Sequence, residues 1–522
     1  MALLKSRTRQ GQLGSRKSHD GCITCKIRKL KCDEQRPACK RCQTTGRKCD
    51  GYIDPRAKGF WSPSTNLAIV QVQTPSTYAS FTQVEVQSFE FFVRRVVPYC
   101  SRTVDEHFWR LLLPQLSHSD PVIWDAVIAL SSLIQHFQSS GRSTVAEIST
   151  APVVKREHRR ALAWYGKSIA RLRAQLNQPG TRSITAVISC ILYICIECLQ
   201  DHPSEAIALY QRAVAMTETM ADPENRTWGS TQSESSVQST VRALLQNMSA
   251  SQRLPLGRSR VLGDTNFETL AAARDSLYAL LFAAHDFIVD ARTITFNKPK
   301  EWTPSSDLIH RQQQLRKDFL KWRSAFEDMT SCPDGVSIQD EAEQCSLLHV
   351  VYAYYFTLVC TCLSMYETDF DDYLPVFQNL VDHASRIITP RSEEQRPVFM
   401  FETRVIPSLF GVAVKCRHPV IRRQAISLLR HGTQVENTWR ADTMADIAEW
   451  SVGIEESGSI YGAFCPEPPA QIELPPEHHR LHWSQVVELP DSTGRATKFH
   501  QVQKWEQDDR HVWSLVNHMV RL

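Results

Sequence analysis

The stretch that decides the fold is residues 21–52, GCITCKIRKLKCDEQRPACKRCQTTGRKCDGY, which holds six of the chain's 16 cysteines. The spacing C-x2-C-x6-C occurs twice in it, around a connection of six residues. The first residues carry charge throughout and show no apolar run of the secretory type. Clustered thiols in a reducing compartment bind metal more often than they form disulfides. The stretch therefore predicts a metal centre with the ligands Cys22, Cys25, Cys32, Cys39, Cys42 and Cys49.

The number of sulfur donors sets the kind of metal site. Each tetrahedral zinc ion needs four donors, so two zinc ions can share six thiolates only if two sulfurs bridge the metals. The doubled spacing makes Cys22 and Cys39, the first cysteine of each half, the expected bridging pair. A disulfide framework, an iron–sulfur site and two separate zinc knuckles are the competing interpretations. The negative charge of the cluster is offset by neighbouring cations, which are Lys26, Arg28, Lys29, Lys31, Lys40 and Arg41.

Charge is divided unevenly along the 522 residues. The first 58 residues hold 16 Lys and Arg against 5 Asp and Glu, whereas the remaining 464 hold 44 against 51. A basic head on an acidic body indicates a polyanionic partner for the head. The net acidity of the body disfavours phosphate binding there.

The chain divides into five expected segments. A 3.6-residue apolar period recurs through the long central segment and predicts a mostly α-helical regulatory domain, interrupted by a polar insertion at 225–265. Short strands are expected near 495–503. The linker shows no heptad pattern, so no coiled coil is predicted directly after the cysteines. The segments are a flexible basic arm (1–17), the cysteine module (18–52), a Ser-, Thr- and Pro-rich linker (53–85), the helical domain (86–465) and an irregular C-terminal segment (466–522).

One uncharged run approaches the length of a membrane span. Residues 346–366 read SLLHVVYAYYFTLVCTCLSMY, but they contain His349 and several hydroxyl groups and lie among helical segments. We therefore expect a buried core helix and no membrane partner.

The other clusters of reactive side chains are expected to have structural roles. The chain is therefore not expected to be an enzyme. No Walker A loop, G-x-G-x-x-G after a strand or G-x-S-x-G elbow occurs. The cluster at 477–482 lacks the H-E-x-x-H order of zinc hydrolases, and two cysteine pairs lie in apolar helical segments. These residues are Glu477, His478, His479 and His482, and the pairs Cys195/Cys198 and Cys360/Cys362.

The cysteine module closely resembles the DNA-binding domain of the fungal binuclear zinc-cluster (Zn2Cys6) transcription factors. The basic run between the second and third cysteines, the Cys32-Asp33 pair, Pro37 and Gly46 also fit that pattern. The resemblance implies two bound Zn²⁺ ions bridged by Cys22 and Cys39, a short helix in each half and a connecting loop shaped by Pro37. Residues 407–431, followed by Glu436 and Trp439, resemble the helical regulatory region of such factors.

DNA reading is expected from the first half of the module. A helix from Cys25 to Lys31 reaches only about three base pairs in the major groove. Lys29 is the expected base-contacting residue, because an ammonium donates to N7 and O6 of guanine and the resemblance places the family's base-contacting lysine there. A CGG-like triplet is the expected target. Phosphate or electrostatic contacts are assigned to Lys26, Arg28, Lys31, Lys40 and Arg41.

These observations indicate a nuclear regulator of RNA polymerase II transcription that binds double-stranded DNA. The competing hypothesis is a zinc-stabilised module that binds protein or RNA and has no defined DNA site. Monomeric binding and homodimerisation through the helical body both stay open, and coregulators are the other expected partners of the body.

Overall fold

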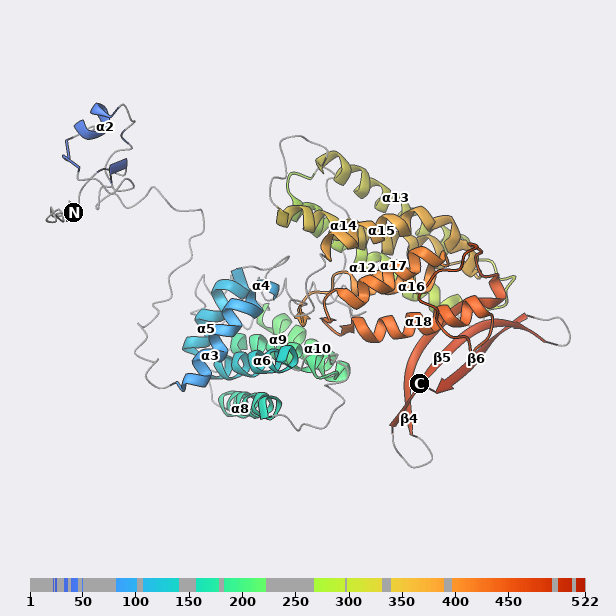
Figure 1. Ribbon diagram of the computed structural model, residues 1–522, viewed down its shortest axis with the longest axis horizontal. Coiled ribbons are helices and arrows are strands. Elements are labelled where there is room, and N and C mark those ends of the chain that lie inside the picture. Colours follow the sequence, from blue (N-terminus) through green and yellow to red (C-terminus); the bar gives the residue numbers. More distant parts are fainter. Residues whose placement is uncertain are drawn as a thin grey trace, which may run out of the picture. The chain divides into compact units, whose positions relative to one another are not determined.

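The computed structural model describes the chain in several stretches, and its residues fall into two compact units, Met1–Ile69 and Val70–Leu522 (Figure 1). The expected arm at 1–17, most of the linker and the insertion at 225–265 lie outside the described residues. The stretches are 22, 24–25, 32–35, 39–45, 49, 81–100, 107–139, 156–177, 183–221, 267–295, 298–330, 339–388, 397–490, 496–508 and 513–521.

The first described helix of the helical unit begins at Gln83. Thr82 and Glu85 form a capping box, in which each side chain accepts a hydrogen bond from the backbone N–H of the other residue. The Trp124 indole also donates to Glu85. The Trp124 ring stacks on Phe81 and Phe89, with centroids 4.1 and 4.9 Å away. The start of the helix is therefore anchored in the core.

The first group of helices packs around one hydrophobic core. Helix α6 starts at Pro121, which suits a first helical turn, and the Asp120 carboxylate accepts from the Val122 N–H at 2.9 Å. The elements are α3 (Gln83–Phe91), η2 (Phe92–Val96), α4 (Val97–Cys100), η3 (Phe108–Leu112), α5 (Leu113–Ser119), α6 (Pro121–Ser139), α8 (Arg156–Leu176), α9 (Ser183–Leu199) and α10 (Pro203–Ala221).

The second group of helices surrounds another core, centred on Trp322. The Trp322 ring stacks on Phe326 and Tyr352, and its indole donates to the Ala273 carbonyl at 2.9 Å. The elements are α12 (Leu270–Thr295), α13 (Ser306–Thr330), α14 (Gln339–Thr361), η5 (Glu367–Tyr373), α15 (Leu374–Ile387), α16 (Ile406–Lys415), α17 (Pro419–His431) and α18 (Ala441–Ser457).

The apolar run at 346–366 lies mostly in α14, where Val350 and Val359 are fully buried. It packs in the second core as the sequence predicts. Across the described part of the chain, no helix is both long and apolar enough to cross a membrane.

A small sheet that the sequence did not predict joins the two groups of helices. Its strands are β1 (Phe399–Met400), β2 (Val435–Glu436) and β3 (Trp439–Arg440), with β1 and β2 parallel and β3 antiparallel to β2. The Glu436 carboxylate accepts three backbone N–H groups at the start of α16, each at 2.9 Å. From β3, the Arg440 guanidinium donates to Asp201 and to two carbonyls at the end of α9. These contacts give Glu436 a structural role.

The C-terminal segment is more regular than expected. Strands β4 (Leu481–Pro490), β5 (Ala496–Gln507) and β6 (Trp513–Arg521) form an antiparallel sheet in that order (Figure 1). The apolar residues of β5, Phe499, Val502 and Trp505, recur every third position and so hide the two-residue period of a strand. Pairing with both neighbours supplies the regularity that the sequence pattern lacks.

A buried network of charges connects this sheet to the helices. Arg417, Arg422 and Glu455 are all fully buried, and Glu455 accepts from both guanidinium groups at 2.7–2.8 Å. Glu455 also accepts from the Leu481 N–H, where β4 begins, at 2.8 Å. Burial would raise the pKa of Glu455, but the two arginines outweigh it and hold that pKa below its ordinary value.

The same network continues through η5. The Glu367 carboxylate accepts from Lys415 at 2.7 Å and from Arg417 at 2.8 Å. Burial opposes its charge, but these two cations outweigh that cost and lower the pKa of Glu367 to about 2. Arg480 forms a two-pronged ion pair with Asp371 at 2.7–2.8 Å. The start of the sheet is thus held to the helices by charge-assisted hydrogen bonds.

Candidate metal centre

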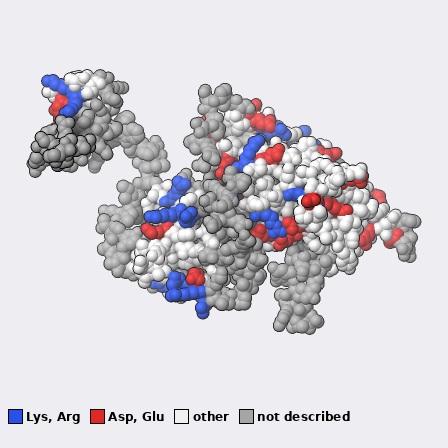
Figure 2. Space-filling view, in the orientation of Figure 1, with Lys and Arg blue, Asp and Glu red and all other residues white. Residues whose placement is uncertain are grey.

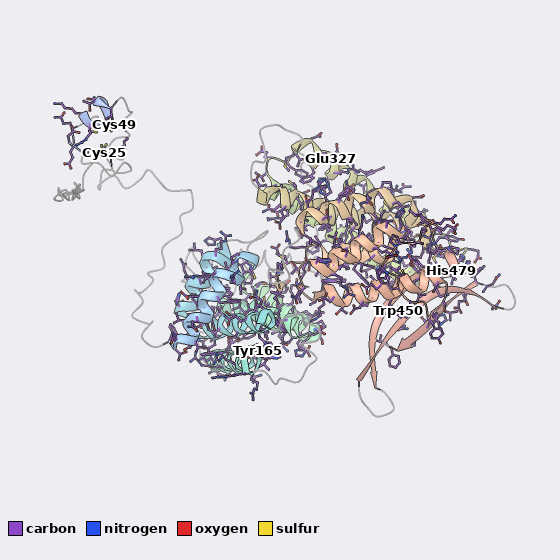
Figure 3. The ribbon with its side chains drawn as sticks, viewed as in Figure 1. Cys25, Cys49, Tyr165, Glu327, Trp450 and His479 are labelled. Carbon is purple, nitrogen blue, oxygen red and sulfur yellow. The ribbon has the colours of Figure 1, made fainter. Side chains whose placement is uncertain are left out.

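The six cysteines of the N-terminal unit lie together and form its described core (Figure 3). Five of them are at most 5% exposed, and Cys49 is partly buried. The Cys22 sulfur lies 3.6 Å from that of Cys39 and 3.8 Å from that of Cys42. The edge of a tetrahedral zinc–thiolate site is about 3.8 Å, given zinc–sulfur bonds of about 2.3 Å. The sulfur spacing therefore fits zinc.

The sulfurs form two groups of four. One group is Cys22, Cys25, Cys32 and Cys39, and the other is Cys22, Cys39, Cys42 and Cys49. Within each group, all four sulfurs lie within 4.8 Å of one another. Cys22 and Cys39 belong to both groups. This is the arrangement that two metal ions with two bridging sulfurs need.

Hydrogen bonds to sulfur repeat in the two halves of the module. The Cys25 N–H donates to the Cys22 sulfur, as the Cys42 N–H donates to the Cys39 sulfur. The Cys22 N–H donates to the Cys32 sulfur, as the Cys39 N–H donates to the Cys49 sulfur, at 3.4 and 3.5 Å. The doubled spacing in the sequence thus produces a doubled local structure, and each backbone donor stabilises negative charge on a thiolate.

Burial alone would keep these thiols protonated. Desolvation raises the pKa of Cys22 to about 12 and also raises the pKa values of Cys25 and Cys39. A bound divalent cation reverses this preference, because metal ligation needs the thiolate and stabilises its charge. The six sulfurs therefore suit metal binding, and without a metal these cysteines would be protonated and unreactive.

Helix α2 (Lys40–Thr44) positions the second half of the module. Cys39 caps it, because its sulfur accepts from the Cys42 N–H. Asp33 also accepts from the Lys40 and Arg41 N–H groups, at 3.0 and 3.3 Å. Desolvation acts against the charge of Asp33, but these backbone donors outweigh it and lower its pKa. Asp33 therefore ties the first half to the helix of the second half, a role that the sequence did not reveal.

The cations assigned to DNA are described only in part. Lys40 and Arg41 are exposed on α2, and Figure 2 shows basic side chains at the surface of this unit. Lys26, Arg28, Lys29, Lys31 and Pro37 lie outside the described residues.

The cluster at 477–482 has structural contacts. Glu477 accepts from the Glu367 and Thr368 N–H groups at 3.0 and 2.9 Å, and its carboxylate lies 3.1 Å from the His482 ring. His478 and His479 contact each other edge to face, and the His479 ring lies beside Gly458 at the end of α18. The carboxylate thus supports the turn that leads into β4.

The cysteine pairs of the helical unit are packed thiols. Cys195 and Cys198 are at most 3% exposed, and burial raises the pKa of both. Burial also raises the pKa values of Cys360 and Cys362. Raised thiol pKa values disfavour nucleophilic or redox chemistry at these positions.

Two family models match the chain. The fungal Zn(2)-Cys(6) binuclear cluster domain matches residues 20–59, and the fungal specific transcription factor domain matches residues 87–445. The second match alone covers more than half of the chain. No solved structure matches the chain.

Similar curated proteins are fungal regulators. The aspercryptin biosynthesis cluster-specific transcription regulator atnN of Emericella nidulans is 32% identical over 216 residues, which are 37% of this chain and 33% of the relative. The transcription regulator lscL of Purpureocillium lilacinum is 25% identical over 34% of this chain and 43% of the relative. The Zn(2)-C6 fungal-type transcription factor afumD of Aspergillus fumigatus is 30% identical over 23% of this chain and 34% of the relative. The chain thus spans between a third and a half of the length of these relatives.

Proposed function

The chain belongs to the fungal specific transcription factor family and carries that family's two-zinc, DNA-binding cluster domain, and from this premise we propose that its zinc module reads CGG-like triplets. The observation that carries the proposal is the pair of four-sulfur groups that share Cys22 and Cys39. One zinc ion is held by Cys22, Cys25, Cys32 and Cys39. The other is held by Cys22, Cys39, Cys42 and Cys49. The ions supply folding energy and carry out no reaction.

The proposed reading of DNA rests on charge and on the size of the module. So small an element reaches few bases, so specificity depends on few side chains. Lys29 donates to guanine N7 and O6, and backbone carbonyls near Arg28 and Lys29 accept from cytosine N4. Phosphates are bound by Lys40 and Arg41, whose exposure on α2 supports this role, and by the other cations of the module.

The helical domain serves regulation in this proposal. Its two apolar cores give a helical scaffold that can present surfaces to partners. We include homodimerisation and coregulator binding among its functions, and the nucleus as the site of action. The competing function, a zinc-stabilised module for protein or RNA, predicts no preference among DNA triplets.

The experiment compares Lys29→Ala with Lys40→Ala in the zinc-loaded full chain. Affinity is measured for duplexes with and without a CGG triplet, at two salt concentrations. Lys29→Ala should lose about 1–3 kcal/mol of binding free energy for the CGG duplex and reduce the preference for that duplex over the one without CGG. Lys40→Ala should weaken binding to both duplexes by the same factor. An equal loss on both duplexes for Lys29→Ala would make Lys29 a phosphate contact. A wild-type chain without triplet preference would favour the competing function.

A further inference from the structure

Helix α8 (Arg156–Leu176) differs in charge from the domain that contains it. Residues after position 58 are acidic in sum, yet α8 carries six cations against one carboxylate, Glu157. In Figure 2, basic side chains gather over this helix. The cations are Arg156, Arg159, Arg160, Lys167, Arg171 and Arg173.

The cations all lie on one side of the helix. The buried side consists of His158, Ala161, Ser168 and Leu172, which pack toward α6 and the first core. At 100° per residue, the opposite arc contains only arginine, lysine, alanine and glycine, and Glu157 falls outside it. The small residues of this arc are Ala163, Gly166, Ala170 and Ala174. We call this arc the basic face of α8.

Two of the cations are already paired. Lys167 and Arg171 lie 3.3 and 2.7 Å from the carboxylate of Asp125, which is fully buried in α6. They anchor the basic face to the core. Arg156, Arg159, Arg160 and Arg173 make no ion pair with any carboxylate that the structure describes. As far as the described residues go, these four can bind an external anion.

The composition of the basic face favours a polyanion over a protein. Protein interfaces are centred on large apolar or aromatic anchors, and the face has none. Beyond its chain neighbours and the helix backbone, no atom lies within 4 Å of where a Cβ on Gly166 would stand, so the face is open at this position, midway along the helix. Cations around small residues permit close approach of a phosphate backbone. The four arginines without a described ion pair extend over 18 residues, from Arg156 to Arg173, or about 26 Å of helix.

DNA is the polyanion that we assign to this face, because the same chain carries a DNA-binding module. The zinc module of the same chain holds DNA, and the 34 positions from Cys49 to Gln83 can span up to about 110 Å. Binding of one module raises the effective concentration of DNA for the other. We propose that the basic face of α8 is a second, sequence-independent DNA contact that binds phosphates flanking the triplet. This inference rests on the proposed function of the zinc module.

The test removes free arginines and leaves the Asp125 pair intact. The variant is Arg156→Gln, Arg159→Gln and Arg160→Gln together, in the zinc-loaded full chain. The control removes the same charge from exposed positions of α13, as Arg316→Gln, Lys317→Gln and Lys321→Gln. Each protein is titrated with two duplexes that carry the same triplet, one of about 12 base pairs and one of about 40.

We expect the α8 variant to bind the long duplex on the order of ten-fold more weakly, with the slope of log K against log salt reduced by about 2 to 3. Its binding to the short duplex, and both affinities of the α13 control, should stay near wild type. Equal effects of the two variants, or no effect of duplex length, would overturn the proposal. Loss of triplet binding by the wild-type chain would instead overturn the proposed function.

A single-charge variant keeps the test valid if the triple variant misfolds. Gly166→Glu adds a carboxylate where there is open space, and Gly166→Gln is its uncharged match. Gly166→Glu should weaken binding to the long duplex, whereas Gly166→Gln should not. If Gly166→Glu binds the long duplex as well as Gly166→Gln does but loses binding to polyglutamate, the face binds acidic protein and the DNA assignment is wrong.

Discussion

The zinc module and the helical domain are stabilised by different means. In the described part of the module, the buried core consists of cysteines. The helical domain has two large cores of aliphatic and aromatic side chains. A chain of about 35 residues cannot bury enough apolar surface to fold alone, so metal binding supplies its folding free energy. The comparison teaches that the zinc module depends on bound metal for its fold, whereas the helical domain has large apolar cores of its own.

Both regions nevertheless bury negative charge, and each balances it with cations. In the module the buried thiolates are balanced by zinc. In the helical domain the buried Glu455 is balanced by Arg417 and Arg422. Removing one member of each charge balance therefore tests whether the stability of the zinc module and that of the helical domain are independent.

The largest effect is expected from the bridging cysteines. Cys22→Ala or Cys39→Ala should lose both zinc ions and specific DNA binding, because each sulfur serves both metals. Cys25→Ala removes a sulfur that belongs to one group only, so it should retain more metal. Zinc content per chain after dialysis is the measurement. Equal metal loss at all six positions would remove the bridging assignment.

The next effect is expected from the buried network. Glu455→Gln leaves two buried guanidinium groups with less compensation and should lower the free energy of unfolding by about 3–5 kcal/mol. The matched control is Glu456→Gln, since Glu456 is 25% exposed and pairs with Arg423. The control should cost about 1 kcal/mol or less. Urea denaturation followed by helical circular dichroism measures both. A similar cost for the two variants contradicts a structural role for the network.

A smaller effect concerns acid stability. The folded pKa of Glu367, about 2, lies below its ordinary 4.5, so this carboxylate stabilises the fold above pH 4.5 and loses that contribution as the pH falls toward 2. The contribution is about 3 kcal/mol. In Glu367→Gln, the free energy of unfolding should be lower at pH 7 and fall less steeply between pH 5 and pH 3. Identical pH slopes for variant and wild type would show that Glu367 is not responsible.

Much of this architecture follows from local sequence patterns. The cysteine spacing predicted the zinc cluster, and the 3.6-residue period predicted a mostly α-helical domain, so the expected fold class is confirmed. These signals are local, because the residues that define a helix or a cysteine knuckle lie within a few positions of one another in the sequence. The segment boundaries drawn from composition stay predictions.

The remaining features depend on residues that are distant in sequence. Glu367, Arg417 and Glu455 look like ordinary surface charges, and only the packing of η5, α18 and the connection between α16 and α17 buries them together. The C-terminal sheet lacks a clear two-residue period, and the two-residue strands β1 to β3 are too short to show any pattern. Glu436 could be singled out by resemblance, but its capping of α16 required the structure.

The most direct test of the central claim follows both regions of the full chain during zinc removal. A chelator is titrated into the protein while anisotropy reports binding to a CGG duplex and circular dichroism reports the thermal melt of the helices. We predict that specific DNA binding disappears as two zinc ions leave, while the melting temperature of the helical domain stays constant. Specific binding that persists without zinc, or a helical melt that falls together with DNA binding, would contradict the account.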